Sequence, residues 1–475
     1  MKRSVPLKII LISIAALIVC ALGIILFLFS RQGSSNDPWS KAIQDEKTIQ
    51  LIDCTPGLSA LPVFCDKEYY ELTAESASEY GADGTPAEDG LRVRIYDTLS
   101  GSPFMESSLI SVSPSGETFL YGIDHLLAIV KNDEITIVTT SDLEYYGIEE
   151  DTSVNDRINV VWSPDETLCA ILYPSQIAAP NVYASLYKDL MLINAETGNL
   201  SYVVRYAPGE YEGEIKSACF SADGKMLYYF DSYSEGPYGA VKECNLLTGA
   251  QKTLCRLEDN VATACPDLCL DAEGNLRSLA FFREKQTSAP VIFTPSEEAW
   301  EAEILDLPSP GFVGPYERYL YSPQSQTELL LKVFNNYPYL ARENASGSLS
   351  AILLPIDGNQ ALSVDVNGEE LQEASQEIST AALPTKLLPV SAALSPSGGQ
   401  VLITTSWGHN SELYLLDLES LYYCTLNVPV DVKAYVEPDE LLIDSQPSKI
   451  AWLADDRIMV PTVDGNRIYQ MEIAE

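Results

Sequence analysis

The sequence predicts an all-β fold, a seven-bladed β-propeller of four-stranded antiparallel blades, preceded by one N-terminal transmembrane helix. Three observations lead to this prediction: a turn motif that recurs seven times, a second kind of turn between its copies, and one long apolar run near the N-terminus. Successive copies of the first turn are roughly 50 to 73 residues apart. Repeat periods of this length are typical of propeller blades that carry long loops.

The first turn joins two runs of β-forming residues in each unit. Its serine can bond the backbone, its proline presets φ, and glycine at the fourth position relieves strain, which is the chemistry of a type I turn. Each copy therefore predicts a pair of antiparallel strands. The copies begin at Ser113, Ser163, Ser221, Asp271, Ser322, Ser395 and, in a degenerate form, Leu453.

A second turn falls between the first ones. Asp or Asn can close an Asx-turn, and a glycine four residues later takes the left-handed position of a bulged hairpin. Two hairpins per unit make a four-stranded sheet, and seven such sheets arranged radially make a propeller. This turn occurs at 97–101, 194–198 and 245–249, and without its glycine at 417–420.

The N-terminus predicts a signal anchor. Residues 9–29 carry no charge, and at 1.5 Å per residue they reach about 31 Å, the thickness of a bilayer core. A cleavable signal has an apolar region of only ~7–15 residues. Because Lys2, Arg3 and Lys8 precede the run and only Arg31 directly follows it, residues 1–8 are expected in the cytoplasm, residues 9–30 in the membrane and the rest outside the cell.

Residues 31–90 are expected to form a linker and small connector with a short helix from Pro38, and residues 91–475 the propeller. The stretches 91–95 and 102–105 resemble the outer half of a blade whose inner half lies at the C-terminus. Pairing the two chain ends would close the ring and remove exposed sheet edges. Either Arg467–Ile473 or Leu91–Ile95 fits the third strand of that blade.

The domain outside the membrane is strongly acidic. Four of the 29 basic residues and none of the 68 acidic residues precede residue 32, so residues 32–475 carry a net charge of −43. Such a charge repels nucleic acid and anionic lipid, which excludes a polynucleotide partner or a second contact with the membrane. It either keeps the domain dispersed or serves a cation or a basic partner.

The turn Ser-Pro-Asp/Ser-Gly-x-x-Leu resembles the WD40-like repeat of TolB-type propellers and of the propeller that caps prolyl oligopeptidase and dipeptidyl-peptidase enzymes. The resemblance covers roughly residues 91–475. It implies a fold and no particular activity, because propellers host unrelated functions. Those peptidases carry a Gly-x-Ser-x-Gly nucleophile elbow in a separate α/β domain. This chain lacks the elbow, so the resemblance implies a propeller without a catalytic domain.

No cofactor or metal site is predicted. The two histidines, His125 and His409, fall in different repeats, which leaves few partners for a catalytic dyad. Cys265 and Cys269 form a single C-x₃-C pair, without the second pair that a zinc site needs. A disulfide is predicted between Cys244 and Cys255, which would lie opposite each other in a hairpin centred on residues 249–250. Two buried unpaired cysteines are the alternative.

A binding face is predicted where the connections between second and third strands emerge together at one end of the ring. Amphipathic rings with nearby amides suit glycan or peptide recognition, although the same rings could fill gaps between blades. The sequence therefore favours a binding or scaffold module for a protein or envelope glycan. The alternative is a hydrolase of envelope glycans or peptides that uses paired carboxylates. The residues of this face are Tyr183, Tyr187, Tyr233, Tyr238, Tyr337, Trp407 and His409.

Overall fold

Five of the seven first turns fold as their sequence predicts. In the first copy, the Gly116 amide donates to the Ser113 carbonyl at 2.9 Å, and the Ser113 hydroxyl accepts from the Thr118 amide at 3.2 Å. Gly116 has a φ of 77°, the left-handed region that glycine tolerates best. Glu166 stands at the same position of the second copy and still adopts a φ of 58°. This copy therefore forms the turn without glycine.

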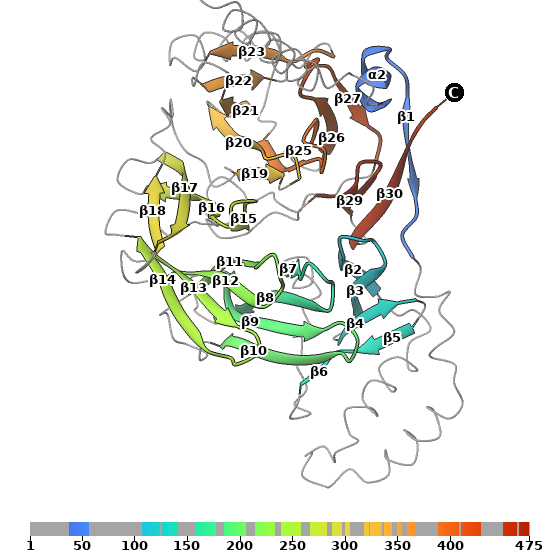
Figure 1. Cartoon of the computed structure of the whole chain (residues 1–475). Helices are drawn as coiled ribbons and strands as arrows, with labels where there is room; N and C mark the ends of the chain where they lie inside the picture. The colour runs from blue at the N-terminus through green and yellow to red at the C-terminus, as the bar shows by residue number, and fades with distance from the viewer. Residues whose placement is uncertain are drawn as a thin grey trace, which may run out of the picture.

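The computed structural model places seven antiparallel sheets in succession around a ring (Figure 1). This confirms the predicted all-β, seven-bladed propeller with four-stranded blades. Short gaps excepted, the structure describes residues 38–56, 107–140, 158–176, 185–205, 214–232, 239–257, 267–304, 318–365, 388–428 and 450–474.

The blades are numbered in chain order. Blade 1 contains β2 (Ser107–Val112), β3 (Thr118–Ile123), β4 (Leu126–Lys131) and β5 (Glu134–Ile137); blade 2 contains β7 (Asn159–Trp162), β8 (Leu168–Gln176), β9 (Ser185–Asn194) and β10 (Asn199–Arg205). Blade 3 contains β11 (Glu214–Phe220), β12 (Met226–Ser232), β13 (Gly239–Asn245) and β14 (Gln251–Leu257); blade 4 contains β15 (Cys269–Leu270), β16 (Leu276–Phe282), β17 (Thr287–Pro295) and β18 (Trp300–Ile304). Blade 5 contains β19 (Arg318–Ser322), β20 (Thr327–Phe334), β21 (Tyr337–Glu343) and β22 (Leu349–Leu353); blade 6 contains β24 (Leu388–Leu394), β25 (Gln400–Trp407), β26 (Asn410–Asp417) and β27 (Tyr423–Leu426).

Two blades have a fifth strand at the outer edge. In blade 2, β6 (Thr139–Thr140) pairs in parallel with β10, although it directly follows blade 1 in the chain. In blade 5, β23 (Leu362–Asp365) pairs antiparallel with β22. The segment before β23 also bridges to blade 6, through Gln360 and Tyr422. These strands tie one blade to the next outside the inner strands.

Blade 7 closes the ring with strands from both ends of the chain. Its order is β28 (Ala451–Ala454), β29 (Arg457–Thr462), β30 (Gly465–Ile473) and then β1 (Ile49–Asp53), which pairs antiparallel with β30 (Figure 1). The C-terminal segment thus supplies the third strand, which settles the choice that the sequence left open. The N-terminal strand is β1, so the start of the propeller at residue 91 was placed too late. The expected strands at 91–95 and 102–105, and the turn at 97–101, lie outside the described residues.

The short helix expected after Asp37 is present as α2 (Pro38–Gln44). Trp39, Ala42 and Ile43 bury one face of this helix in the apolar core between blades 6 and 7. That core also holds Leu413 and Leu426 of blade 6, together with Ile458, Val460, Tyr469 and Met471 of blade 7. α2 and β1 therefore close the ring as one unit, a helix followed by a strand.

The second turns also form. The Asn194 side chain accepts from the amides of Glu196 and Thr197 at 3.0 and 2.9 Å, and Gly198 has a φ of 70°. The turn that starts at Asn245 repeats this arrangement. In blade 6, where glycine is missing, Leu421 takes the left-handed position with a φ of 63°.

Two of the first turns depart from the expected four-residue pattern. In blade 5 the amide that bonds the Ser322 carbonyl is that of Gln326, at 2.7 Å, so this turn is one residue longer. In blade 7 only Asp455 and Asp456 join β28 to β29.

Within the part of the chain that the structure describes, no helix is long and apolar enough to cross a membrane. The apolar run at 9–29 lies outside those residues.

Candidate functional site

The two ends of the ring have different roles. We call the end that carries the turns between first and second strands the first-turn end. Adjacent turns bond one another there: Glu166 accepts from the amide and hydroxyl of Ser115, both at 2.6 Å, and Asp455 accepts from the Ser397 amide at 3.2 Å. The first-turn end is therefore held together by bonds between blades.

Carboxylates at the first-turn end act as acceptors for their own turns. The Ser163 hydroxyl donates to Asp165 at 2.7 Å and lowers the pKa of that carboxyl. Hydrogen bonds from Lys225 and Ser221 lower the pKa of Asp223 to about 2. Partial burial opposes the charge of Glu166, but the two bonds from Ser115 outweigh it and lower the pKa. A general acid at neutral pH needs a raised pKa, so these three carboxyls are unsuited to that role.

The predicted binding residues that the structure describes belong to the other end of the ring, which we call the connection end. Three of them lie in strands, next to the connections between second and third strands. Trp407 is the last residue of β25 and pairs with Asn410, and Tyr337 is the first of β21 and pairs with Phe334. Tyr187 lies near the start of β9 and pairs with Pro174. The backbone thus brings positions from blades 2, 5 and 6 to one end. Tyr183, Tyr233, Tyr238 and His409 lie outside the described residues.

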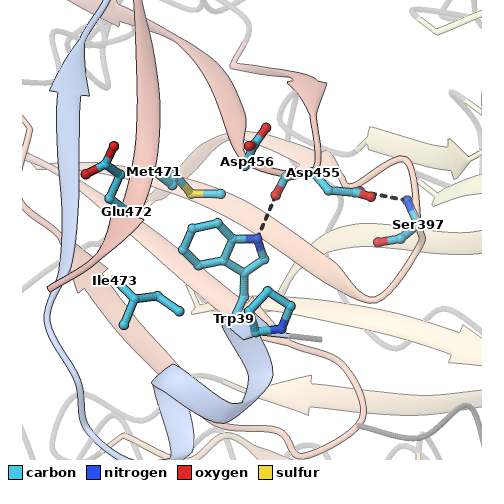
Figure 2. Close-up of a pocket in the computed structure, with 8 residues that line it drawn as sticks. Trp39, Ser397, Asp455, Asp456, Met471, Glu472 and Ile473 are labelled. Carbon is cyan, nitrogen blue, oxygen red and sulfur yellow. Dashed lines mark hydrogen bonds between the residues drawn. The ribbon is translucent and has the colours of Figure 1, made fainter. Parts of the chain in front are cut away.

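The sequence did not predict a pocket of about 790 Å³ at the first-turn end, beside α2 (Figure 2). Its lining comes from three segments: the start of α2, the first turns of blades 6 and 7, and the end of β30. The indole Nε1 of Trp39 donates to the Asp455 carbonyl at 2.8 Å, which fixes the ring at the edge of the pocket. The lining residues are Pro38, Trp39, Ser397, Asp455, Asp456, Met471, Glu472 and Ile473. The one feature of the sequence that points to this pocket is the pair of aspartates in the degenerate seventh turn.

The junction of blades 4 and 5 holds a buried charge cluster. Arg277 of β16 donates from Nε to Asp271 at 2.7 Å and from a terminal nitrogen to Glu328 of blade 5. Its guanidinium also lies 5.6 Å from the ring centroid of Tyr321. Burial alone would raise the pKa of Asp271, but the bonds from Arg277 and Asn275 outweigh burial and lower it. This cluster links two blades, so its role is structural.

The Asp271→Asn variant is expected to be less stable at neutral pH by about 1–3 kcal/mol, because a charged acceptor of buried hydrogen bonds becomes neutral. A carboxyl whose pKa is lowered on folding stabilises the protein above its unfolded pKa of 3.8, and this contribution is lost as the pH falls through the lower, folded value. Urea unfolding of both proteins should therefore show a gap at pH 7 that narrows below about pH 4. Glu301→Gln, at an exposed position of β18, is the control. A gap of the same size at pH 3 would contradict the prediction.

The predicted disulfide between Cys244 and Cys255 is wrong. The register of β13 and β14 places Cys244 opposite Gln251 and Cys255 opposite Val241. Cys244 packs in the core between blades 2 and 3, whereas Cys255 packs against the core between blades 3 and 4. The two side chains thus point to opposite faces of the sheet, and both thiols are free. The error arose because the loop is centred one to two residues earlier than expected.

The buried cysteines behave as small apolar residues. Burial raises the pKa of Cys169 to about 12, and it also raises the pKa of Cys219 and of Cys269. A protonated thiol is neither a nucleophile nor a metal ligand. Cys265 and His125 lie outside the described residues. Within the described residues, no group of three or more His, Cys, Asp or Glu side chains could hold a metal ion.

Comparison with known proteins identifies no family. No protein-family model and no curated protein matches the chain. Among solved structures, the chain is similar to hydrazine synthase of Kuenenia stuttgartiensis, with 10% identity, a TM-score of 0.45 and coverage of 79% of this chain and 99% of the other. It is also similar to an oligogalacturonate lyase in complex with manganese, with 10% identity, a TM-score of 0.47 and coverage of 79% of this chain and 92% of the other. For TolB from Acinetobacter baumannii the identity is 15% and the TM-score 0.32, and the match covers 72% of this chain and 70% of the other. Each similarity is one of fold, so none transfers an activity to this chain.

Proposed function

We propose that this chain is a membrane-anchored, extracytoplasmic propeller that binds a protein or a glycan of the cell envelope at its connection end. The observation that carries the proposal is the contrast between the two ends. Bonds between neighbouring turns and the helix α2 occupy the first-turn end, whereas strand-end positions of Tyr187, Tyr337 and Trp407 lie at the connection end.

The place of α2 supports this orientation. Trp39 and Ser40 bond Asp455 and Asp417, both in turns at the first-turn end. Seven residues, 31–37, separate the predicted span from α2, and an extended chain of that length reaches at most ~25 Å. The first-turn end would then face the membrane, and the connection end would face outward to a partner.

The topology is tested by protease shaving of intact cells. Residues 32–475 are expected to be digested from the outside, because the charge asymmetry around residues 9–29 places them there. Protection of this region in intact cells, or a mature N-terminus after Phe29, would show that the proposed anchoring is wrong.

The ligand face is tested by photo-crosslinking in cells. A photoreactive amino acid in place of Asn410, the first residue of β26 at the connection end, is expected to capture the partner, and mass spectrometry then distinguishes protein from glycan. The same probe in place of Leu247 is the control, because that side chain is 93% exposed and lies in a second turn, at the first-turn end. Equal capture from both positions would contradict the proposed face.

Replacing Trp407 and Tyr233 together by alanine is expected to abolish this capture while leaving the melting temperature almost unchanged. Interface aromatics often carry most of a binding energy, whereas exposed rings contribute little to folding. Crosslinking yield and thermal melting are measured on the same protein. If the double variant melts much earlier, the rings belong to the core and are not ligand anchors.

A further inference from the structure

The pocket beside α2 combines an apolar floor with an acidic rim (Figure 2). Trp39 and Met471 are buried and Ile473 is half-buried, whereas Asp455, Asp456 and Glu472 are exposed. A volume of about 790 Å³ falls within the range of pockets that hold small ligands or peptide side chains. The pocket thus offers contact area and negative charge in the same place.

No basic side chain neutralises this rim from within the pocket lining. None of the ion pairs between described residues involves Asp455, Asp456 or Glu472. Arg457, the next residue in the chain, directs its guanidinium to Gly116 of blade 1 instead. The negative charge of the rim can therefore attract a basic group from outside the chain.

The pocket is also pre-organised. Asp455 is held through its side chain by the Ser397 amide at 3.2 Å and through its carbonyl by Trp39 at 2.8 Å. The Asp456 carbonyl accepts from the Met471 amide at 2.8 Å, which ties the turn to β30. A rigid site loses little conformational entropy when it binds.

We propose that this pocket is a docking site for a lysine- or arginine-bearing segment of a protein partner. The charge complementarity selects a cation, and the apolar floor selects a cation on an aliphatic stem. Lysine and arginine pack such stems against apolar surface while the charged head stays in water, here at the carboxylate rim. The site lies at the first-turn end and is separate from the ligand face at the connection end.

The test uses the full chain in a neutral detergent and the fluorescent peptide Gly-Leu-Lys-Leu-Lys-Leu-Gly, followed by anisotropy. Saturable binding is expected, and the same peptide with glutamate for lysine should not bind. The Asp456→Asn/Glu472→Gln variant should bind about tenfold more weakly, as expected for the loss of two exposed ion pairs. Asp455 is left intact because it holds the turn.

The control variant is Glu301→Gln/Glu303→Gln, which removes the same charge from exposed positions of β18 in blade 4. Its affinity should equal that of the unmodified chain. Equal weakening in both variants would mean that the peptide senses only the overall acidity, and the absence of saturable binding would mean that no docking site exists. Either result overturns the proposal.

Discussion

Replacing Trp39 by alanine is expected to lower the free energy of unfolding by about 3–5 kcal/mol, the usual cost of removing a large buried aromatic side chain. Trp39 is only 6% exposed and packs in the core shared by blades 6 and 7. It also donates the hydrogen bond to the Asp455 carbonyl. The loss therefore affects the unit of α2 and β1 that closes the ring, and urea unfolding measures it.

The location of this effect distinguishes ring closure from ordinary core packing. Hydrogen exchange should accelerate first in β30 and β1, because local opening begins where contacts have been removed. Trp39→Phe keeps most of the apolar area and should lose less stability than alanine. Leu247→Ala, at a fully exposed position, should change stability by less than about 0.5 kcal/mol. Faster exchange spread evenly over all seven blades would contradict a role in closure.

The sequence predicted most of the propeller because its turns are local. The bonds between Ser113 and Gly116 depend on neighbouring residues only, so a repeated motif was enough to locate the hairpins. The strand count followed from two hairpins per unit. The extra length of the turn at Ser322 had no visible signal, because Ser322 and Pro323 match the first two positions of the motif.

Long-range pairing was harder to predict. β1 has only five residues, and it joins β30 from the other end of the chain, with Ile49 opposite Ile473. No local pattern marks a strand of this kind, whereas the β-rich stretch at 91–95 resembled one. The register of β13 and β14 failed for a related reason: the loop is centred earlier than expected, and a register shift between Val241 and Lys242 then moves Cys244 and Cys255 to opposite faces of the sheet.

The two candidate sites also differ in how far the sequence could predict them. The end of the ring to which Tyr187, Tyr337 and Trp407 belong follows from antiparallel topology, so it could be predicted. The pocket beside α2 depends on a helix, two turns and the end of β30 that meet only in the folded ring. Composition alone could not show that meeting, because the acidic residues of the pocket are a small part of a uniformly acidic chain.

Replacing Lys242 by methionine is expected to destabilise the protein by about 3–5 kcal/mol, because it leaves a buried carboxylate without its cation. Lys242 forms an ion pair with Asp231 across β12 and β13, and the two side chains are 22% and 1% exposed. The pair lies within blade 3, far in the ring from the closing blade. Chemical unfolding of the single variant measures the loss.

Two further variants make this prediction specific. Asp231→Leu together with Lys242→Met should recover most of the lost stability, since a buried ion pair replaced by apolar residues of similar volume is often neutral. Lys225→Met removes a lysine from the neighbouring pair with Asp223, where the atoms are 2.9 Å apart but the side chains are 76% and 56% exposed. That change should leave stability almost unchanged, because ion pairs between exposed side chains contribute little. A loss of equal size in Lys225→Met and Lys242→Met would show that burial of Asp231 does not set the cost.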